Sequence, residues 1–561
     1  MKRLALLVLL LPSSASALEL VRAPYLQMTG PTSTSIVFRT DDPCAGAILW
    51  GTEAGVLDQA VATGTTTEHV AELADLTPST EYWYEARCND LRIDPDAQPS
   101  FVTPPPVGER APLRAWIVGD SGIGAFAQWQ VRDAAVSAWG LDVPDLFLHL
   151  GDMAYGDGTD SQFTNNFYGV YSAQLRSIPV FPTMGNHEGH TSVADDEAGP
   201  YYEGYVLPRG GELGGVASGT EAYYSFDQAN VHFIVLESHQ SDRSPGSAML
   251  TWLAEDLAAT DQEWIVSYWH HPPYTKGSHD SDVEIRHIDM RENALPILEA
   301  GGVDLVLGGH SHIYERSWLL QGAYETPSTS FGIVDSGDGK PDGDGPYVLD
   351  EGLGADDGTL YVVAGHGGAG TSQDGVHPLM YFAEPANGSV LMDVVGNRMT
   401  LRNVRFDSEI TDTVTLLKGA GIDVVSPDGT EVLVAGVDTE ITWGSAGVGG
   451  EATISWTCDD GASWIELGTA PTSSGRFDWT VPAIDTRHGR VRVAADGLED
   501  VSDGRFEVEA GSDTALVPCP DPPPPDVEPD ETDCADCGGE AAFLPLVLLG
   551  GLGLRRRRLT G

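Results

Sequence analysis

Lysine is scarce in this chain of 561 residues, since only four occur, at positions 2, 276, 340 and 418. Lysine and arginine together number 30 against 84 aspartate and glutamate residues, which gives a formal net charge of −54. A surface with this charge repels the phosphate backbone of nucleic acids, so nucleic-acid binding is excluded as a main role. Polyanionic substrates are repelled as well, except where a local group of cations overcomes the field.

Long apolar runs are also missing. The stretch Ala541–Leu554, which precedes Arg555–Arg558, is shorter than the roughly 20 residues that span a bilayer. At the other end, residues 1–17 carry two basic residues, an apolar stretch from Leu4 to Leu11 and Ala15-Ser16-Ala17. This pattern predicts a secretory signal peptide with cleavage before Leu18, and therefore a mature protein outside the cytoplasm.

Cysteine is sparse, with six residues in the whole chain. An exported protein can form disulfides, and Cys44 and Cys88 lie in one candidate β-domain where they could pair. Cys458 is alone in its candidate domain, so we expect a buried free thiol there. Cys534 and Cys537 lie near the C-terminus, where a redox or zinc site is disfavoured because no second cysteine pair follows.

Five short motifs with metal-ligand side chains are the main chemical signal of the sequence. Each follows an apolar run typical of a buried strand: Leu113–Val118, Leu146–Leu150, Val180–Met184, Trp264–Trp269 and Val303–Leu307. Side chains beyond the carboxyl ends of such strands converge at one edge of an α/β layer. The motifs are Gly119-Asp120-Ser121-Gly122, Gly151-Asp152-Met153-Ala154-Tyr155, Gly185-Asn186-His187-Glu188, His270-His271-Pro272-Pro273-Tyr274 and Gly309-His310-Ser311-His312.

This set of residue types suits a two-metal hydrolase. Two ions about 3.5–4 Å apart can clamp the attacking and leaving oxygens of a displacement at phosphorus, which requires one bridging carboxylate and separate ligands for each ion. Asp152 is the natural bridge. Carboxylate, amide and phenolate oxygens suit a hard ion, while imidazoles suit iron, zinc or manganese. Any one motif alone is an ordinary turn or polar loop, but the five together predict a metal centre.

The order and spacing of the motifs resemble the calcineurin-like metallophosphoesterases, and within them the purple acid phosphatases, over Leu113–Arg405. The sequence Ile313-Tyr314-Glu315-Arg316 also resembles the family's sequence after its paired histidines. The resemblance implies a fold of two mixed β-sheets flanked by helices. It also implies two sets of ligands that share Asp152: Asp120, Asp152, Tyr155 and His312 for one ion, and Asp152, Asn186, His270 and His310 for the other.

The resemblance to the purple acid phosphatases in particular rests on Tyr155. A tyrosine three residues after the bridging aspartate can bind Fe(III) as a phenolate, and a trivalent ion readily lowers the phenol pKa from its usual value of about 10. The resemblance therefore implies iron at the Tyr155 site. The second ion is left open between iron, zinc and manganese.

Two further histidines match family positions that contact the substrate phosphate. His187 follows the ligand Asn186, and His279 lies nine residues after His270, so the resemblance implies catalytic roles for both. Asp280 stands where plant enzymes carry a second histidine proposed as general acid. His366 follows another strand-like run, Leu360–Val363, and either lines the site or lies in a turn.

The flanking regions predict accessory domains. Residues 18–105 show short alternating strands, with Ser35–Arg39 and Ala47–Trp50 among them, and Leu76–Tyr82 resembles a loop of fibronectin type III domains. The catalytic domain is expected at 110–410. Residues 420–510 predict an immunoglobulin-like β-sandwich whose tryptophans, at 443, 456, 464 and 479, form its core.

The C-terminal region is expected to lack a core. Residues 511–540 form an acidic, proline-rich linker, and residues 541–561 resemble the sorting tails of myxobacterial surface proteins. The resemblance implies secretion from, or attachment to, the outer envelope of a Gram-negative bacterium. In the catalytic domain, the aspartate-rich loop 335–345 is either a solvated turn or a structural calcium site.

The sequence as a whole predicts a multidomain, secreted phosphatase with two metal ions, which hydrolyses phosphate monoesters by attack of a metal-bound hydroxide. A phosphodiesterase or nucleotidase could use the same centre. The non-enzymatic alternative is a surface adhesive or binding protein with a vestigial metal centre. The complete ligand set argues against it.

Overall fold

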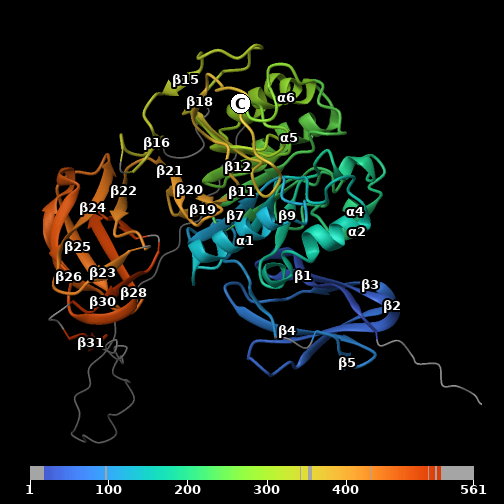
Figure 1. The fold of residues 1–561 in the computed structure, drawn as a ribbon, viewed down its shortest axis with the longest axis horizontal. Coiled ribbons are helices and arrows are strands. Elements are labelled where there is room, and N and C mark those ends of the chain that lie inside the picture. The colour runs from blue at the N-terminus through green and yellow to red at the C-terminus, as the bar shows by residue number, and fades with distance from the viewer. Residues whose placement is uncertain are drawn as a thin grey trace, which may run out of the picture. The chain divides into compact units, whose positions relative to one another are not determined.

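The computed structural model describes residues 18–94, 98–341, 343–350, 357–429, 431–502, 504–511 and 515–519 (Figure 1). The predicted signal peptide, the predicted tail and most of the predicted linker lie outside the described residues. All described residues belong to one compact unit that ends at Cys519. None of their helices combines the length and the apolar character that crossing a bilayer requires.

The N-terminal region is all-β. Its sheet is connected through the long strand β2, which pairs antiparallel with β1, β3 and β4. The two strands expected at Ser35–Arg39 and Ala47–Trp50 are therefore one strand, because pairing with β3 resumes at Cys44 after an irregularity. The strands are β1 (Leu20–Gly30), β2 (Ser33–Gly51), β3 (Gln59–Leu73), β4 (Glu81–Cys88), β5 (Leu91–Arg92) and β6 (Ser100–Val102).

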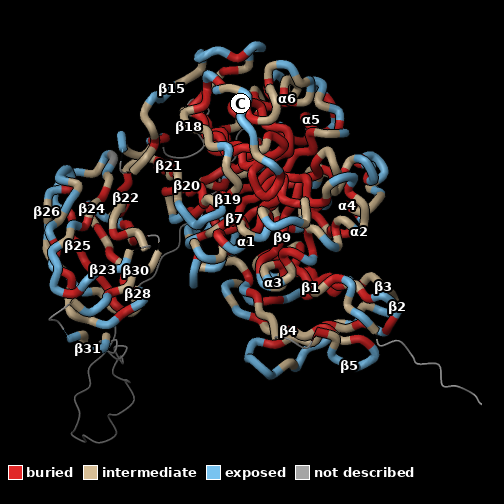
Figure 2. Tube along the Cα trace, in the orientation of Figure 1, coloured by how far each residue is buried: buried red, intermediate tan, exposed pale blue. Residues whose placement is uncertain are grey.

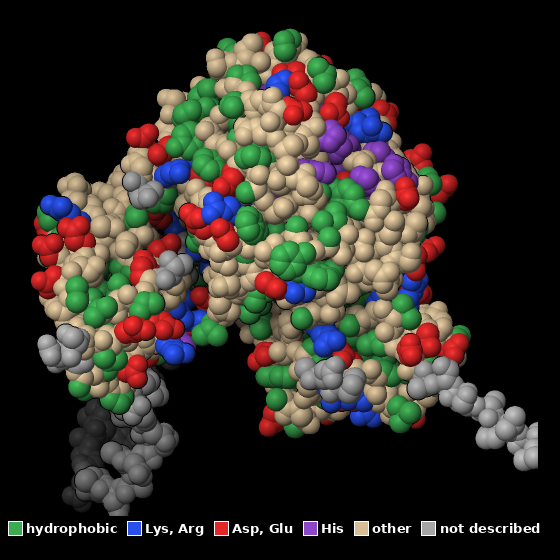
Figure 3. All heavy atoms as spheres, in the orientation of Figure 1, with side chains coloured by type: hydrophobic (Ala, Val, Ile, Leu, Met, Phe, Trp, Pro, Cys, Tyr) green, Lys and Arg blue, Asp and Glu red, His purple; other side chains and the backbone are tan. Residues whose placement is uncertain are grey.

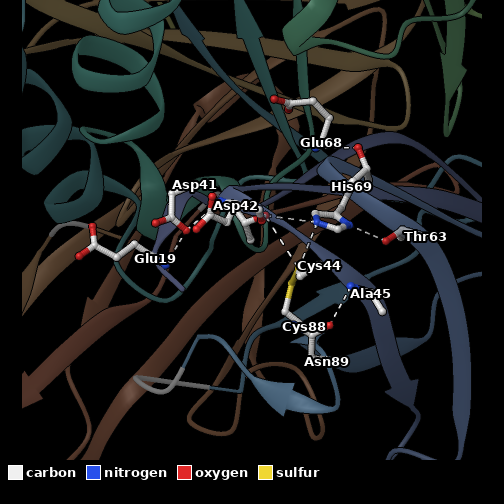
Figure 4. Close-up of a disulfide and its surroundings, with 12 residues drawn as sticks. Glu19, Asp41, Asp42, Cys44, Ala45, Thr63, Glu68, His69, Cys88 and Asn89 are labelled. Carbon is white, nitrogen blue, oxygen red and sulfur yellow. Dashed lines mark hydrogen bonds between the residues drawn. A yellow bond between two sulfur atoms is a disulfide. The ribbon is translucent and has the colours of Figure 1, made fainter. Parts of the chain in front are cut away.

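A disulfide joins Cys44 of β2 to Cys88 of β4, as the sequence predicted (Figure 4). The buried ring of His69 lies beside it, with Nε2 3.6 Å from the Cys44 sulfur and Nδ1 2.6 Å from the Thr63 hydroxyl.

The Tyr82 hydroxyl accepts a hydrogen bond of 2.8 Å from the backbone of Thr77. A tyrosine bonded back to the preceding loop is typical of immunoglobulin-like sandwiches.

Two mixed sheets form the central region. The first runs in the order β16-β21-β20-β19-β7-β8-β9, and the second in the order β10-β11-β12-β13-β17-β14-β15, with β18 paired to β14. The strands of the first sheet are β7 (Leu113–Val118), β8 (Leu146–His149), β9 (Val180–Pro182), β16 (Tyr347–Leu349), β19 (Gly388–Val395), β20 (Arg398–Arg405) and β21 (Ile410–Lys418).

The second sheet contains the remaining central strands. They are β10 (Tyr224–Gln228), β11 (Val231–Val235), β12 (Trp264–Trp269), β13 (Leu305–Gly308), β14 (Tyr314–Leu320), β15 (Ile333–Asp335), β17 (Thr359–Ala364) and β18 (Met380–Glu384). Strands β11, β12, β13 and β17 are parallel, as are β7, β8 and β9. The two mixed sheets match the expected fold.

The main core lies between the two sheets, where buried residues of both form one hydrophobic cluster. Figure 2 shows buried residues concentrated in this central region. Helix α1 (Phe126–Trp139) packs on β19 and β20, while α5 (Ala248–Ala259) and α7 (Leu295–Ala300) enclose a second cluster on the other sheet. Short helices occupy the loops: α2 (Asp160–Gln162), α3 (Ser172–Leu175), α4 (Pro200–Gly204), α6 (Ile285–Asp289), π-helical segments Phe163–Tyr168 and Met290–Ala294, and 3-10 turns Glu188–His190 and Thr472–Ser474.

The C-terminal region consists of two further sheets, β22-β24-β27 and β23-β30-β28-β25-β26, with β29 and β31 paired to β28. Trp443, Trp456 and Trp479 are buried in its core, whereas Trp464 is half-buried under the Arg492 guanidinium. The strands are β22 (Gly421–Ser426), β23 (Val432–Val434), β24 (Asp438–Ala446), β25 (Glu451–Thr457), β26 (Ile465–Pro471), β27 (Arg476–Thr480), β28 (Ile484–Ala495), β29 (Leu498–Val501), β30 (Phe506–Glu509) and β31 (Val517–Pro518).

The expectation of a free thiol at Cys458 is wrong, because Cys458 forms a disulfide with Cys519. Cys519 lies in the stretch that the sequence assigned to the linker. Strand β31 pairs with β28 and brings the chain back to the sandwich, so this part of the linker is attached to the domain. A covalent link between residues 61 positions apart stabilises a fold by restricting its unfolded chain.

The aspartate-rich loop closes on itself through hydrogen bonds. Asp338 accepts bonds from the backbone of Lys340 and Asp344, both 2.9 Å, and Asp335 accepts one of 2.7 Å from Gly337. Among the described residues of this loop, no three ligand side chains converge on one point. This geometry is that of a turn, and structural calcium there stays a prediction.

Candidate metal centre

The loops that follow β7, β8, β9, β12 and β13 bring all seven predicted ligand side chains to one edge of the two sheets. Three of them form a first group. The Tyr155 hydroxyl lies 3.1 Å from Asp120 Oδ1 and 3.1 Å from His312 Nε2, and His312 Nε2 lies 3.5 Å from Asp120 Oδ1. Three of the four residues predicted for the Tyr155 site therefore lie together.

The other four side chains form a second group around His270. Its Nε2 atom lies 2.9 Å from Asn186 Oδ1, 3.2 Å from His310 Nδ1 and 3.5 Å from Asp152 Oδ1. Ligand atoms of Asp120, Asp152 and His270 all lie within 4.8 Å of one another, so the two groups adjoin. Asp152 lies where a bridging carboxylate would be required.

The orientation of the histidines tests whether these residues fit metal ions. His270 Nδ1 lies 2.8 Å from the carbonyl oxygen of Leu150, and His312 Nδ1 lies 3.1 Å from that of Gly370. Each Nδ1 must therefore donate its proton to a carbonyl, and in a neutral ring Nε2 then presents a lone pair. Both lone pairs face oxygen ligands of the same group. A cation between them satisfies both, and a backbone carbonyl on the second nitrogen is usual for metal-binding histidines.

The pKa values of His270 and Tyr155 also indicate that the two groups require a cation. Burial disfavours a charged His270, but Asp152 outweighs burial and raises the pKa of His270 to about 9. Burial, together with the carboxylates of Asp120 and Asp152, raises the pKa of Tyr155 well above its ordinary value. A phenolate at Tyr155 therefore requires a strongly charged ion beside it.

The backbone at the centre is strained and closely packed. Asp120, Asp152 and His310 adopt positive φ angles of 57°, 57° and 62°, which non-glycine residues rarely do. Such conformations cost about 1–3 kcal/mol each and concentrate at functional sites. A Cβ at Gly185 would lie 2.2 Å from Asp152 Oδ1, so glycine is needed next to Asn186.

Glu188 is a buried positioning residue that the sequence did not single out. Its carboxylate accepts hydrogen bonds from the backbone of Asp152 (2.8 Å), Gly185 (2.9 Å) and Ala154 (3.0 Å). Burial and the nearby Asp152 raise the pKa of Glu188 to about 7. The residue ends the third motif, so its position was visible in the sequence, but the loops that it joins were not.

The two predicted catalytic histidines lie beside different ligand groups. The His187 ring packs 4.2 Å from that of Tyr155, and its Nδ1 lies 2.6 Å from the carbonyl oxygen of Gly156. The His279 ring stacks on His310 at 3.8 Å, and its Nδ1 lies 2.8 Å from Glu284 Oε1. Both side chains are partly exposed and remain accessible to a ligand of the centre.

Lys276, Asp280 and His366 have partners outside the two ligand groups. Lys276 pairs with Asp280 and with Asp282, so neither Lys276 nor Asp280 is directed at the ligand groups. His366 is buried and its Nε2 lies 2.9 Å from Asn403 Oδ1 on β20. Of the two alternatives for His366, the structure favours the turn, since His366 lies in the connection after β17 and contacts Asn403 rather than a predicted ligand.

A pocket of about 450 Å³ opens over the second ligand group. Figure 3 shows histidine side chains gathered on this face of the molecule. The pocket is lined by Asn186, His190, His239, His271, His279, Glu284, Ile285, Arg286 and His310. His190, His239 and Arg286 lie outside the motifs, and no local sequence signal marked them.

Comparison with known proteins relates part of the chain to phosphoesterases. Residues 113–314 match the calcineurin-like phosphoesterase family. Purple acid phosphatase 22 of Arabidopsis thaliana is 29% identical over 315 residues, which cover 52% of this chain and 66% of the relative. Purple acid phosphatase 15 of the same plant is 28% identical over 278 residues, covering 44% and 49%. The chain thus spans less than two thirds of the length of these two relatives.

Among solved structures, a purple acid phosphatase from yellow lupin (Lupinus luteus) superposes with a TM-score of 0.55 at 18% identity, covering 71% of this chain and 75% of the lupin chain. At this identity the likeness concerns the fold. The chain therefore contains a calcineurin-like metallophosphoesterase domain, with purple acid phosphatases among its homologues.

Proposed function

We propose that the protein is a phosphatase that hydrolyses phosphate monoesters with two metal ions, in the manner of an acid phosphatase. The observation that supports this best is the pair of adjoining ligand groups, in each of which a histidine lone pair faces oxygen ligands. Two ions bound there would polarise the phosphoryl oxygens and lower the pKa of a bound water.

Each ligand group has its own ion in this proposal. Asp120, Tyr155 and His312 would hold Fe(III), because a phenolate at Tyr155, whose pKa is raised, needs a trivalent ion beside it. Asn186, His270 and His310 would hold iron, zinc or manganese, and Asp152 would be the carboxylate shared by the two ions. His187 and His279 donate hydrogen bonds to the substrate phosphate from either side, and the Gly156 carbonyl and Glu284 keep their rings in place.

The setting of the activity is also a proposal. The signal-like residues 1–17 support export, and the tail resemblance supports secretion or attachment at the outer envelope of a Gram-negative bacterium. A nonspecific monoesterase in that place would release phosphate from organic esters outside the cell. Its substrates are phosphate esters, and nucleic-acid binding is not part of the role.

The test combines metal analysis, a visible spectrum and turnover of p-nitrophenyl phosphate by the purified protein. We expect iron, a violet band and monoesterase activity. Asp152→Ala removes the bridge and should abolish both metal binding and turnover, whereas Tyr155→Phe should remove the colour. Asp133→Asn, on the exposed surface of α1, is the control and should keep metals, colour and rate.

Other results would point elsewhere. Two colourless divalent ions with a preference for a diester such as bis(p-nitrophenyl) phosphate would make the protein a phosphodiesterase. Full metal occupancy without turnover of either substrate would support a binding protein. Colour that persists in Tyr155→Phe would mean that the phenolate is assigned to the wrong residue.

A further inference from the structure

Arg286, in α6, differs from every other cationic side chain in the described part of the chain. Each other described lysine and arginine forms an ion pair with a carboxylate. In a protein with a net charge of −54, such pairing is expected everywhere. An arginine kept apart from carboxylates in this environment needs a reason.

The guanidinium is held in place by one contact. Arg286 Nε donates a hydrogen bond of 3.0 Å to the carbonyl oxygen of His239, which fixes the plane of the group. No described protein group accepts from its two terminal nitrogens. Two parallel N–H donors in a fixed plane match the geometry of a carboxylate or phosphate oxygen pair.

The position of Arg286 relates it to the metal centre. The pocket that it lines also contains Asn186 and His310, two of the predicted ligands, together with His190 and His239. The pocket therefore extends from the second ligand group to Arg286. A volume of about 450 Å³ leaves room for more than the phosphate that the metals would bind.

The one carboxylate among the lining residues does not neutralise Arg286. Glu284 Oε1 lies 2.8 Å from His279 Nδ1, and its Oε2 lies 3.7 Å from both His310 Nε2 and His287 Nε2. The carboxylate of Glu284 thus faces histidines. Arg286 lines the same pocket and keeps its full positive charge.

We propose that Arg286 forms a subsite for a second anionic group on the leaving-group side of the substrate. The favoured substrates are then phosphate compounds whose leaving group itself carries a phosphate or a carboxylate. This inference rests on the proposed function and specifies its substrate class. The scissile phosphate binds at the ligand groups with His187 and His279, and the second anion binds in the fork of Arg286.

The experiment compares Arg286→Gln with the wild-type protein on three substrates: p-nitrophenyl phosphate, whose leaving group has no second anionic group, 3-phosphoglycerate, which adds a carboxylate, and inorganic pyrophosphate, which adds a phosphate. Loss of a charge-assisted hydrogen bond is expected to raise KM for the last two by about tenfold or more. The kcat values and the p-nitrophenyl phosphate kinetics should stay within about twofold. Arg286→Lys keeps the charge without the fork and should restore part of the loss.

Arg476→Gln is the matched control. It removes the same charge from an exposed position in the C-terminal region, so it reports the effect of net charge alone. A KM increase restricted to pyrophosphate would identify the second anion as a phosphate, and an increase with both 3-phosphoglycerate and pyrophosphate would identify a general anion subsite. Equal losses on all three substrates, or no loss on any, would overturn the proposal.

Failure of the proposed function is distinguishable from failure of the subsite. If the wild-type protein turns over none of the three substrates, binding of inorganic pyrophosphate is measured by calorimetry on the metal-loaded protein. Weaker binding to Arg286→Gln with unchanged binding of inorganic phosphate would support the subsite without catalysis. Equal binding of pyrophosphate to both proteins would reject it.

Discussion

At the scale of single residues, Glu188 shows how the centre is held together. Its two carboxylate oxygens accept three backbone N–H groups from the loops after β8 and β9. In Glu188→Gln, one oxygen becomes an NH₂ group that faces an N–H donor. We expect metal affinity or kcat/KM to fall by about 10–100-fold, as is usual when a group that positions metal ligands is changed. Metal content after gel filtration and steady-state kinetics measure this.

The control is Glu203→Gln, on the exposed surface of α4, which changes the charge equally and should leave both quantities unchanged. Thermal unfolding separates a loss of fold from a loss of metal. A Glu188→Gln protein with full metal content and the normal rate would show that the loops after β8 and β9 hold their shape without this carboxylate.

At the scale of secondary-structure elements, His232 links three of them. His232 belongs to β11. Its Nδ1 atom lies 2.7 Å from Asp227 Oδ1 on β10, and its Nε2 atom lies 2.9 Å from Asp256 Oδ2 on α5. Burial disfavours the charged ring, but the two carboxylates outweigh burial and raise the pKa of His232 to about 9. A raised pKa stabilises the fold fully below the unfolded-state pKa of about 6.5, and this stabilisation disappears as the pH rises through 9.

We compare the free energy of unfolding of wild type with that of His232→Gln. The advantage of wild type should shrink by on the order of 3 kcal/mol as the pH is raised from about 6 to about 10. Urea unfolding of both proteins at the two pH values measures this difference, and groups common to both proteins cancel from it. The sign of the change in this difference with pH is what tests the raised pKa of His232. A difference that is constant with pH would mean that the ring is neutral in the folded protein.

The elements that carry the centre could be predicted from the sequence because each signal is local. Apolar runs followed by Asp120, Asp152 and His270 mark strands and the loops beyond them, and β7, β8 and β12 lie where these runs predicted. Residues that act through tertiary packing gave no such signal. Arg286 lines the pocket of the centre only because tertiary folding brings the start of α6 to it, and Cys519 reaches Cys458 where β31 pairs with β28.

At the scale of the whole molecule, the net charge of −54 opposes the approach of any anionic substrate. In about 0.01 M salt the field extends roughly 30 Å from the surface, and in 0.15 M salt only about 8 Å. Screening removes the long-range repulsion, while attraction by the metals and Arg286 acts at shorter range and is retained. We expect kcat/KM for p-nitrophenyl phosphate to rise several-fold over this range of ionic strength, with kcat nearly constant.

Sodium chloride and sodium acetate are compared, so that binding of one particular anion to the metals is recognised as a difference between the salts. Since the charge is spread over the molecule, Arg476→Gln should follow the same curve as wild type. A fall of kcat/KM with both salts would mean that the positive field of the centre extends beyond the pocket and attracts substrate, despite the acidic surface around it.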